Sequence, residues 1–84
     1  MLEEKQRLRK GQVWRKLTNN YLVTLTGKTQ SKSGFDYWHT RGLFNRKNSH
    51  RIAEKDILKF FYFEGYEWNE KSRLKKEYPR QLCV

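Results

Sequence analysis

Cysteine and long apolar runs are scarce in this sequence, and each scarcity excludes a class of protein. Because Cys83 is the one cysteine, the chain has no internal disulfide and no cysteine-built zinc site, and we expect a reducing, cytoplasmic location. The longest apolar run, residues 60–63, is far shorter than the roughly 20 residues of a membrane-spanning helix. The charged residues 3–5 leave no room for the apolar core of a secretory signal. We therefore expect a soluble protein and no membrane partner.

Acidic residues are also few. The chain has 84 residues, with 19 Lys and Arg against 9 Asp and Glu, which gives a net charge of +10. Hydrophobic residues make up only 36%, so one domain with a thin core is expected, without the deep cavity of a large catalytic domain. A positive charge of this size in a short chain favours a polyanionic partner.

High charge with low hydrophobicity is also typical of disordered chains. The aromatic content argues against disorder here, because the sequence holds three Trp, five Tyr and five Phe but a single proline. Each buried aromatic side chain removes about 150–250 Å² from water, which offsets part of the chain entropy lost on folding. We predict a folded centre at residues 11–68 between basic, helical ends at residues 1–10 and 69–84.

Alternation of apolar and polar residues predicts short strands in the centre. Asn19-Asn20 is a turn sequence that tolerates left-handed geometry, so the strands around it should form a hairpin. In the third strand Tyr37, His39 and Arg41 should share one face and Trp38 the other. The expected strands are residues 12–18, 21–26, 35–41 and 50–53, with polar loops at 27–34 and 45–49.

After residue 53 the spacing of the apolar residues changes from the alternation typical of strands to the spacing typical of helices. Ile57, Phe60 and Phe61 have the spacing of a short helix packed on the strands, whereas residues 61–68 could instead hold a fifth strand with Gly65 as its bulge or turn. Asn69 is a plausible N-cap for a last helix at residues 70–78. Charges of opposite sign at the two ends of residues 2–10 predict the N-terminal helix, with Gly11 as its C-cap.

Four or five short strands in so small a chain must bury one face, and closing into a barrel does this while removing exposed edges. The segments that carry a family resemblance are Lys10-Gly11-Gln12-Val13-Trp14, the strand 21–26, Tyr37-Trp38, Ile52, Asp56-Ile57-Leu58 and Phe61. Their layout resembles SH3-like barrels and is most similar to small barrel proteins of phages and other mobile elements. The resemblance covers about residues 10–62 and implies a mainly β fold, an SH3-like barrel with a short helix, and a binding role.

Motifs for catalysis are weak or missing. Gly27-Lys28-Thr29 lacks the first glycine of a P-loop, because Leu22 occupies its position. His39 and His50 come near one another if their strands pair, and with an aspartate they could form a metal or acid/base pair. Hydrogen bonding to backbone or solvent is the more common role of such histidines. We therefore expect no enzyme activity, no cofactor and no metal.

The leading hypothesis is a non-catalytic protein that binds nucleic acid, DNA or RNA. Phosphate contacts are expected from Lys28, Lys32, Arg41, Arg46, Lys47, Arg51, Arg73, Lys75 and Lys76. Asn45, Asn48 and Ser49 would add hydrogen bonds in the basic loop. Of Tyr37 and Trp38 one must point away from the core, where it either stacks on a base or lies under a terminal helix.

The alternative is a phage-type interaction module that binds and modulates an acidic host protein. Six of the nine residues at 60–68 are aromatic, too many to be interior in so small a protein. Tyr62, Tyr66 and Trp68 are therefore candidate protein contacts, in a homodimer or with a partner. A third hypothesis is an RNA- or ribosome-associated role for the basic ends.

Overall fold

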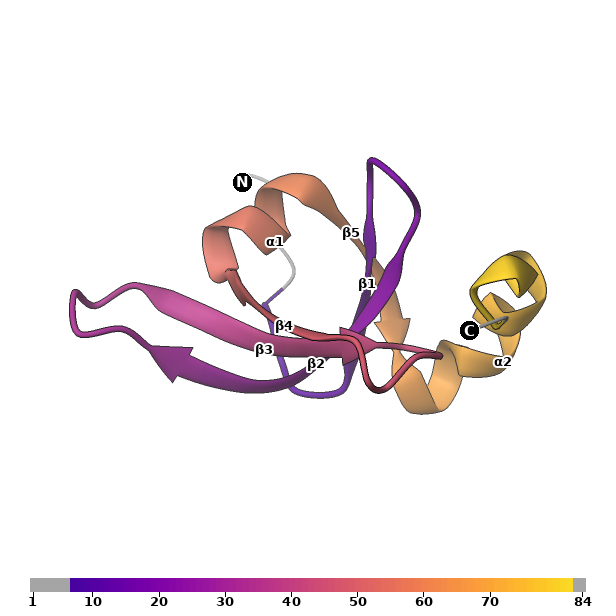
Figure 1. Cartoon of the computed structure of the whole chain (residues 1–84), viewed down its shortest axis with the longest axis horizontal. Helices are drawn as coiled ribbons and strands as arrows, with labels where there is room; N and C mark the ends of the chain where they lie inside the picture. Colours follow the sequence, from indigo (N-terminus) through magenta and orange to yellow (C-terminus); the bar gives the residue numbers. More distant parts are fainter. Residues whose placement is uncertain (1–6, 83–84) are drawn as a thin grey trace.

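Five antiparallel strands form one sheet in the computed structural model, which describes residues 7–82 (Figure 1). The elements are β1 (Gln12–Lys16), β2 (Leu22–Gln30), β3 (Asp36–Gly42), β4 (Ser49–Ala53), α1 (Glu54–Phe60), β5 (Phe61–Tyr66), α2 (Glu67–Glu77) and a 3-10 helix (Pro79–Leu82). The strand order β4-β3-β2-β1-β5 returns the last strand to the side of the first. Since β4 and β5 remain the two edges, the sheet is barrel-like but open.

The β1–β2 hairpin forms where Asn19-Asn20 predicted it. Asn20 adopts a left-handed φ of 62°, and the side-chain oxygen of Asn19 accepts a hydrogen bond from the Tyr21 amide at 2.9 Å. The amide of Lys16 donates to the Tyr21 carbonyl and closes the hairpin. Asparagine tolerates this backbone and supplies the local acceptor, so the turn chemistry is visible in the sequence.

β2 is longer than its apolar pattern predicts. The strand continues through Gly27 to Gln30, so the expected loop at 27–34 is reduced to residues 31–35. The polar half of β2 pairs with β3 as far as Gln30 opposite Asp36, after a register shift between Leu25 and Gly27. Ladder hydrogen bonds to β3 hold this segment extended although it has no apolar side chain to bury.

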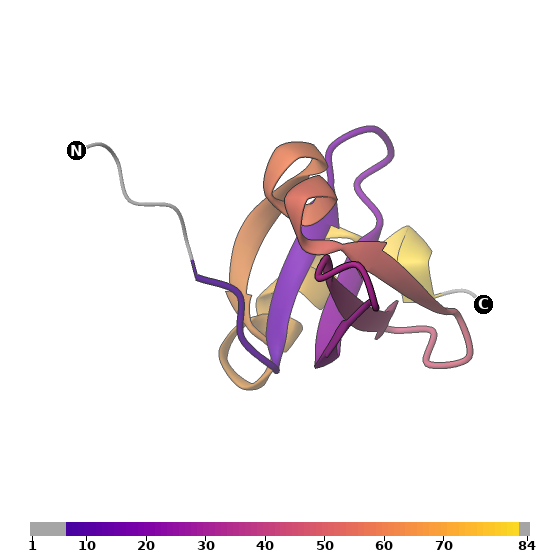
Figure 2. The same ribbon diagram turned by 90° about the vertical axis from the view of Figure 1, so that its left-hand side faces the viewer.

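One face of the sheet packs around three strands and α1. Trp14, Val23, Leu25 and Trp38 form this core with Ile57 of α1. Figure 2 shows α1 above the curved strands, and the helix joins the two edge strands β4 and β5. The two alternatives for residues 54–68 occur one after the other, because α1 ends at Phe60 and β5 begins at Phe61.

Gly65 marks the β-bulge expected in β5. Val13 pairs with Gly65 and Trp14 with Phe63, which leaves Glu64 as the extra residue of the bulge. Gly65 has a φ of +123°, a conformation that side chains rarely adopt. The bulge turns the end of β5 toward α2.

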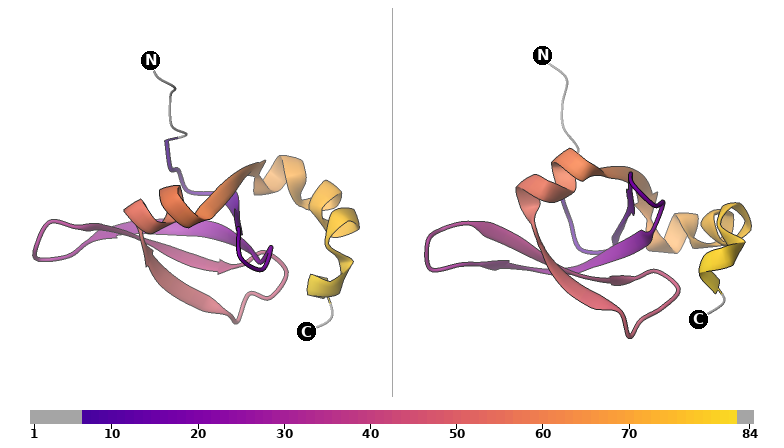
Figure 3. Two further views of the ribbon diagram at one scale, coloured as in Figure 1. Left: turned by 90° about the horizontal axis from the view of Figure 1, so that it is seen from above. Right: turned by 45° about the horizontal axis from the view of Figure 1, so that its top comes forward.

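The opposite face of the sheet packs under α2. Val13, Leu22 and Leu43 form a second core with Leu74, and Figure 3 shows the two helices on different sides of the sheet. The helix begins at Glu67, earlier than the predicted Asn69 cap, because the Glu67 amide donates to the Gly11 carbonyl at 2.9 Å. Asn69 therefore lies inside the helix, and its prediction as N-cap is wrong.

The predicted N-terminal helix is not formed in the part of residues 1–10 that the structure describes. Residues 1–6 lie outside the description, and residues 7–9 have no regular secondary structure. The buried Gln12 side chain accepts from the Arg9 amide and donates to the Arg7 carbonyl, at 3.0 and 2.8 Å. These bonds compete with helical pairing, and they place Leu8 against the first core.

The Leu74→Ala variant tests whether burial of this side chain anchors α2 on the sheet. Its side chain is fully buried, so Leu74→Ala should lower the free energy of unfolding by about 2–5 kcal/mol through lost contacts and a cavity. Urea unfolding of the variant measures this loss. The exposed neighbour change Lys75→Ala is the control and should stay within about 0.5 kcal/mol of the parent. A Leu74→Ala loss as small as the control's would mean that α2 is not anchored by this residue.

Candidate nucleic-acid interface

The outer face of the sheet has two different halves. Its apolar half lies under α2, whereas its other half, on β3 and β4, is polar. Arg41 lies opposite both Thr24 of β2 and Ser49 of β4, and His39 lies opposite Arg51. Directly opposite residues of antiparallel strands point to the same face, so these side chains share one surface. The predicted face of His39 and Arg41 is therefore confirmed.

A shallow hollow of about 510 Å³ opens on this polar half. It is lined by Thr26, His39, Thr40, Arg41, Arg46, Ser49, His50 and Arg51. The lining residues include three arginines and no carboxylate. Two of them, Thr40 and His50, direct their side chains to the face of the sheet opposite to Arg41. We call the lining residues together the basic hollow. Its chemistry is that of an anion site, because guanidinium groups match the geometry of phosphate oxygens.

The cations of the hollow differ in how far they are neutralised. Within residues 7–82, Arg46 and Arg51 pair with no carboxylate, and Arg51 lies over the Tyr37 ring at 5.0 Å. Arg41 Nη2 is 3.5 Å from Glu67, a long contact, and its buried Nη1 has no hydrogen-bond partner among the described residues. The hollow therefore combines two guanidinium groups that have no carboxylate partner within residues 7–82, one of them against the Tyr37 ring, with one weakly paired group.

Lys47 and the two loop asparagines do not line the basic hollow. Lys47 is exposed next to Arg46 and pairs with no carboxylate in the described part of the chain. Asn45 accepts from the Lys47 amide, and the Asn48 side chain donates to the Tyr21 hydroxyl at 2.7 Å. These asparagines shape the loop, whereas Ser49 lines the hollow as expected.

The two histidines lie on adjacent strands, as the sequence suggested. His50 lies opposite Thr40, one position from His39, and its Nε2 is 2.8 Å from Asn48 Oδ1. Across residues 7–82 there is no group of three or more side chains suited to holding a metal. His50, opposite Thr40, lies on the face away from Arg41. The His39 imidazole shares the face of Arg41 and lines the basic hollow. Sequence reasoning missed this, although the shared face of His39 and Arg41 pointed to it.

The two aromatic residues predicted to stack differ in exposure. Trp38 is only 5% exposed, and its Nε1 donates to Glu54 at 2.8 Å, so its prediction as a stacking surface is wrong. Its neighbour Tyr37 points the other way, as alternation requires, but is half-buried under the Arg51 guanidinium. Trp38 therefore offers no stacking surface, and the Arg51 guanidinium covers one face of the Tyr37 ring.

The predicted lysines of the β2–β3 hairpin lie apart from the hollow. Lys28 Nζ is 3.5 Å from Asp36 and 3.7 Å from Glu54, which neutralise much of its charge. Lys32 is exposed in the loop at the far end of the hairpin, which projects from the rest of the molecule in Figure 1. Neither lysine lines the basic hollow.

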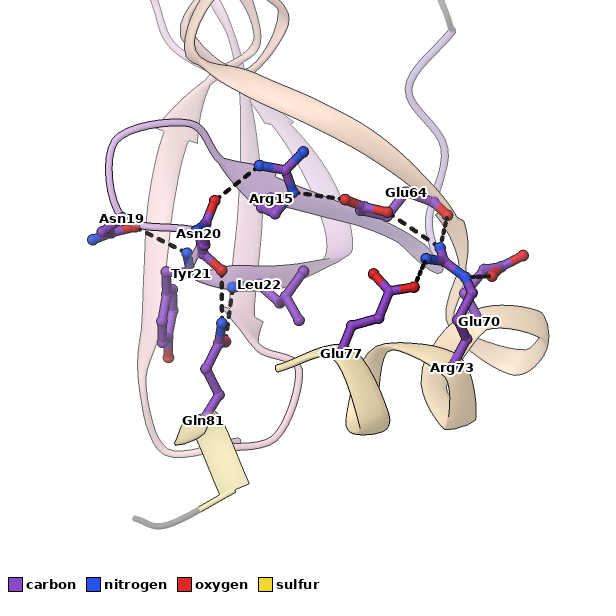
Figure 4. Close-up of polar contacts among 10 residues, drawn as sticks. All are labelled: Arg15, Asn19, Asn20, Tyr21, Leu22, Glu64, Glu70, Arg73, Glu77 and Gln81. Carbon is purple, nitrogen blue, oxygen red and sulfur yellow. Dashed lines mark hydrogen bonds and ion pairs between the residues drawn. The ribbon is translucent and has the colours of Figure 1, made fainter. Parts of the chain in front are cut away.

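Arg73 is part of a structural network rather than a free cation (Figure 4). Its guanidinium binds Glu70, Glu77 and Glu64 at 2.6, 2.7 and 3.2 Å, and these bonds raise the pKa of Arg73 well above its ordinary value. Glu64, 8% exposed, also accepts from Arg15 at 2.7 Å, and this bond raises the pKa of Arg15. The network joins α2 to β5 and β1.

Lys75 and Lys76 remain exposed on α2, outside the basic hollow. The structure therefore brings together Arg41, Arg46 and Arg51 of the predicted phosphate contacts, with Lys47 beside them. It separates the others from this group. Pairing with carboxylates explains the exclusion of Lys28 and Arg73, and distance along the hairpin explains that of Lys32.

The three candidate protein contacts differ in how far their side chains are exposed. Tyr62 and Trp68 are 55% and 70% exposed, so the expectation that some rings of residues 60–68 stay outside the core is met. Tyr66 is half-buried, with its ring 6.1 Å from Phe63 and 4.7 Å from Trp68. Tyr62 and Trp68 thus offer surface, whereas Tyr66 supports a neighbour.

Comparisons of the chain with protein-family models, with curated proteins and with solved structures gave no match. In the described part of the chain, no helix is both long and apolar enough to cross a membrane. A function for this chain therefore has to come from its own surface chemistry.

Because Arg73 is held in the ion-pair network, we expect its replacement to lower stability without a specific loss of oligonucleotide affinity. Arg73→Gln should lower the free energy of unfolding by only about 1 kcal/mol, because the ion pairs are partly exposed. Its affinity for oligonucleotides should match that of Lys76→Gln, a control that removes the same charge from α2. Thermal unfolding and fluorescence anisotropy measure the two effects. A tenfold loss of affinity for Arg73→Gln alone would place this residue in the interface.

Proposed function

We propose that this protein binds nucleic acid without catalysis and that the basic hollow holds the phosphate backbone. The observation that carries the proposal is the hollow's composition, in which Arg41, Arg46 and Arg51 lie with His39 and Ser49 and no lining residue is a carboxylate. The open outline suits a continuous chain of phosphates better than an enclosed small molecule. Phosphate contacts of this kind give affinity and position but carry no base sequence information.

The arginines have complementary roles in this proposal. Arg46 and Arg51, which lack a carboxylate partner among residues 7–82, supply the main electrostatic attraction. The Ser49 hydroxyl and the His39 imidazole add hydrogen bonds to phosphate oxygens, whereas the Thr26 hydroxyl already donates to the His39 carbonyl at 3.1 Å. Neutralising a phosphate releases a condensed counterion, so binding strength should depend steeply on salt.

We further propose that the open sheet is an SH3-like barrel of the phage type and that the protein acts in the cytoplasm. The strand order, with the last strand beside the first and a short helix before it, supports the barrel assignment. Barrels of this kind serve more often in binding than in catalysis, in keeping with the absence of a catalytic motif in the sequence.

A protein-interaction module is the second candidate function. Leu17, Phe60 and Tyr62 are exposed where β1 ends and β5 begins, and the Leu17 amide donates to the Phe60 carbonyl at 3.0 Å. Exposed apolar groups with arginine nearby are typical of protein interfaces, and Arg15 lies over the Tyr62 ring. In this case Tyr62→Ala should abolish self-association or host-protein binding while leaving oligonucleotide affinity unchanged.

Salt dependence tests the nucleic-acid proposal. If about four to six phosphates are neutralised, log K should fall with log[salt] with a slope of about −4 to −5 on duplex DNA. Arg46→Ala and Arg51→Ala should each weaken binding for all sequences and reduce the slope by about 1. Anisotropy titrations between low and moderate salt measure both quantities.

Lys59→Ala is the matched control, because Lys59 lies over Phe60 on α1, outside the basic hollow. The control should keep the parent affinity within about twofold, a shift of under 0.5 kcal/mol. Equal losses for Lys59→Ala and Arg51→Ala would show diffuse attraction without a site. No binding to duplex or single strands at low salt would refute the proposal.

A further inference from the structure

Trp68 is the most exposed of the large hydrophobic side chains that the structure describes, at 70%, whereas Trp14 and Trp38 are almost fully buried. Its ring packs 4.7 Å from Tyr66, tilted by 32°. It also lies against the backbone of Gly11, where an added Cβ would meet the indole at 2.7 Å. The indole is therefore fixed by packing while most of its surface faces solvent.

A second hollow, of about 390 Å³, joins Trp68 to the basic hollow. It is lined by Lys10, Gly11, Thr24, Leu25, Thr26, Arg41, Glu67 and Trp68. Thr26 and Arg41 line both hollows, so the surface is continuous from the indole to Arg46 and Arg51. The chain thus places an exposed aromatic ring at one end of a cationic path.

The charges along this path change between its two ends. Glu67 stands beside Trp68 and binds Lys71 and Arg41 at 3.6 and 3.5 Å, so the indole end carries a partly neutralised carboxylate together with the exposed Lys10. A phosphate is disfavoured next to a carboxylate, whereas a neutral base with amino or imino donors is not. The Trp68 end therefore suits a base and the Arg46–Arg51 end suits phosphates.

We propose that the ligand is a single-stranded nucleic acid that stacks one base on Trp68 and runs its backbone past Arg41 into the basic hollow. This inference rests on the proposed function and narrows it. In a duplex the bases are paired and stacked on each other, so only a single strand can present a free base to the indole. The long Arg41–Glu67 contact is one that a phosphate oxygen can replace at the junction.

Intrinsic fluorescence tests the stacking directly, since Trp68 is the one tryptophan with open surface. The full chain is titrated at low salt with oligo-dT, oligo-U, a DNA hairpin duplex and inorganic polyphosphate. Oligo-dT and oligo-U should quench the emission, and polyphosphate should bind without comparable quenching. A stacked base contributes about 1–3 kcal/mol, so Trp68→Ala should weaken single-strand binding by roughly 5- to 150-fold.

Two variants separate stacking from other effects. Trp68→Phe keeps an aromatic face and should recover part of the lost affinity, and Phe35→Ala removes an exposed ring that lines neither hollow and should change nothing. Polyphosphate affinity should be the same in Trp68→Ala and the parent. Circular dichroism confirms that each variant is folded before it is titrated.

The outcomes distinguish this inference from the function on which it rests. If oligo-dT binds Trp68→Ala as tightly as the parent, or the duplex binds as well as the single strand, the stacking inference is wrong and phosphate binding stands. If none of the four polyanions binds even at low salt, the proposed function itself fails.

Discussion

Burial of both faces of β2 is the constraint on which the rest of the structure depends. Leu22, Val23, Thr24 and Leu25 are all buried although they alternate between the two faces. Each face therefore needs its own cover, α1 over Val23 and Leu25 and α2 over Leu22. Because α2 covers only the apolar half of the outer face, the half on β3 and β4 stays open, and the basic hollow lies there.

Ion pairing determines which parts of the surface carry positive charge that no carboxylate neutralises. Six of the carboxylates in residues 7–82 are paired, and they neutralise Arg73, Lys71, Lys28, Arg15 and Arg41 in whole or part. These pairs hold α2 on β5 and the β2–β3 hairpin near α1. The net charge of +10 is therefore expressed unevenly, and the basic hollow is a surface with cations but no carboxylate.

Local patterns predicted what local chemistry determines. The Asn19-Asn20 turn, the bulge at Gly65 and the common face of His39 and Arg41 follow from backbone tolerance and a period of two. The same alternation showed that Tyr37 and Trp38 oppose each other, but which one is interior depends on α1 and Glu54. Two further features could not be predicted from residue spacing, because each depends on contacts between side chains and distant or irregular parts of the chain. Arg73 is paired with three glutamates, and the segment before Gln12 is held extended by the Gln12 side chain.

The start of α2 links the fold to the stacking surface. The Glu67 amide bonds to the Gly11 carbonyl, so the helix begins before Asn69 and Trp68 enters its first turn. Gly11, at a φ of +94° and without a Cβ, lets the indole lie directly on the backbone. A ring held this way has already lost its rotamer freedom, so a base that stacks on it incurs little further entropy cost. The exposed indole is thus preorganised by the same contact that positions the helix.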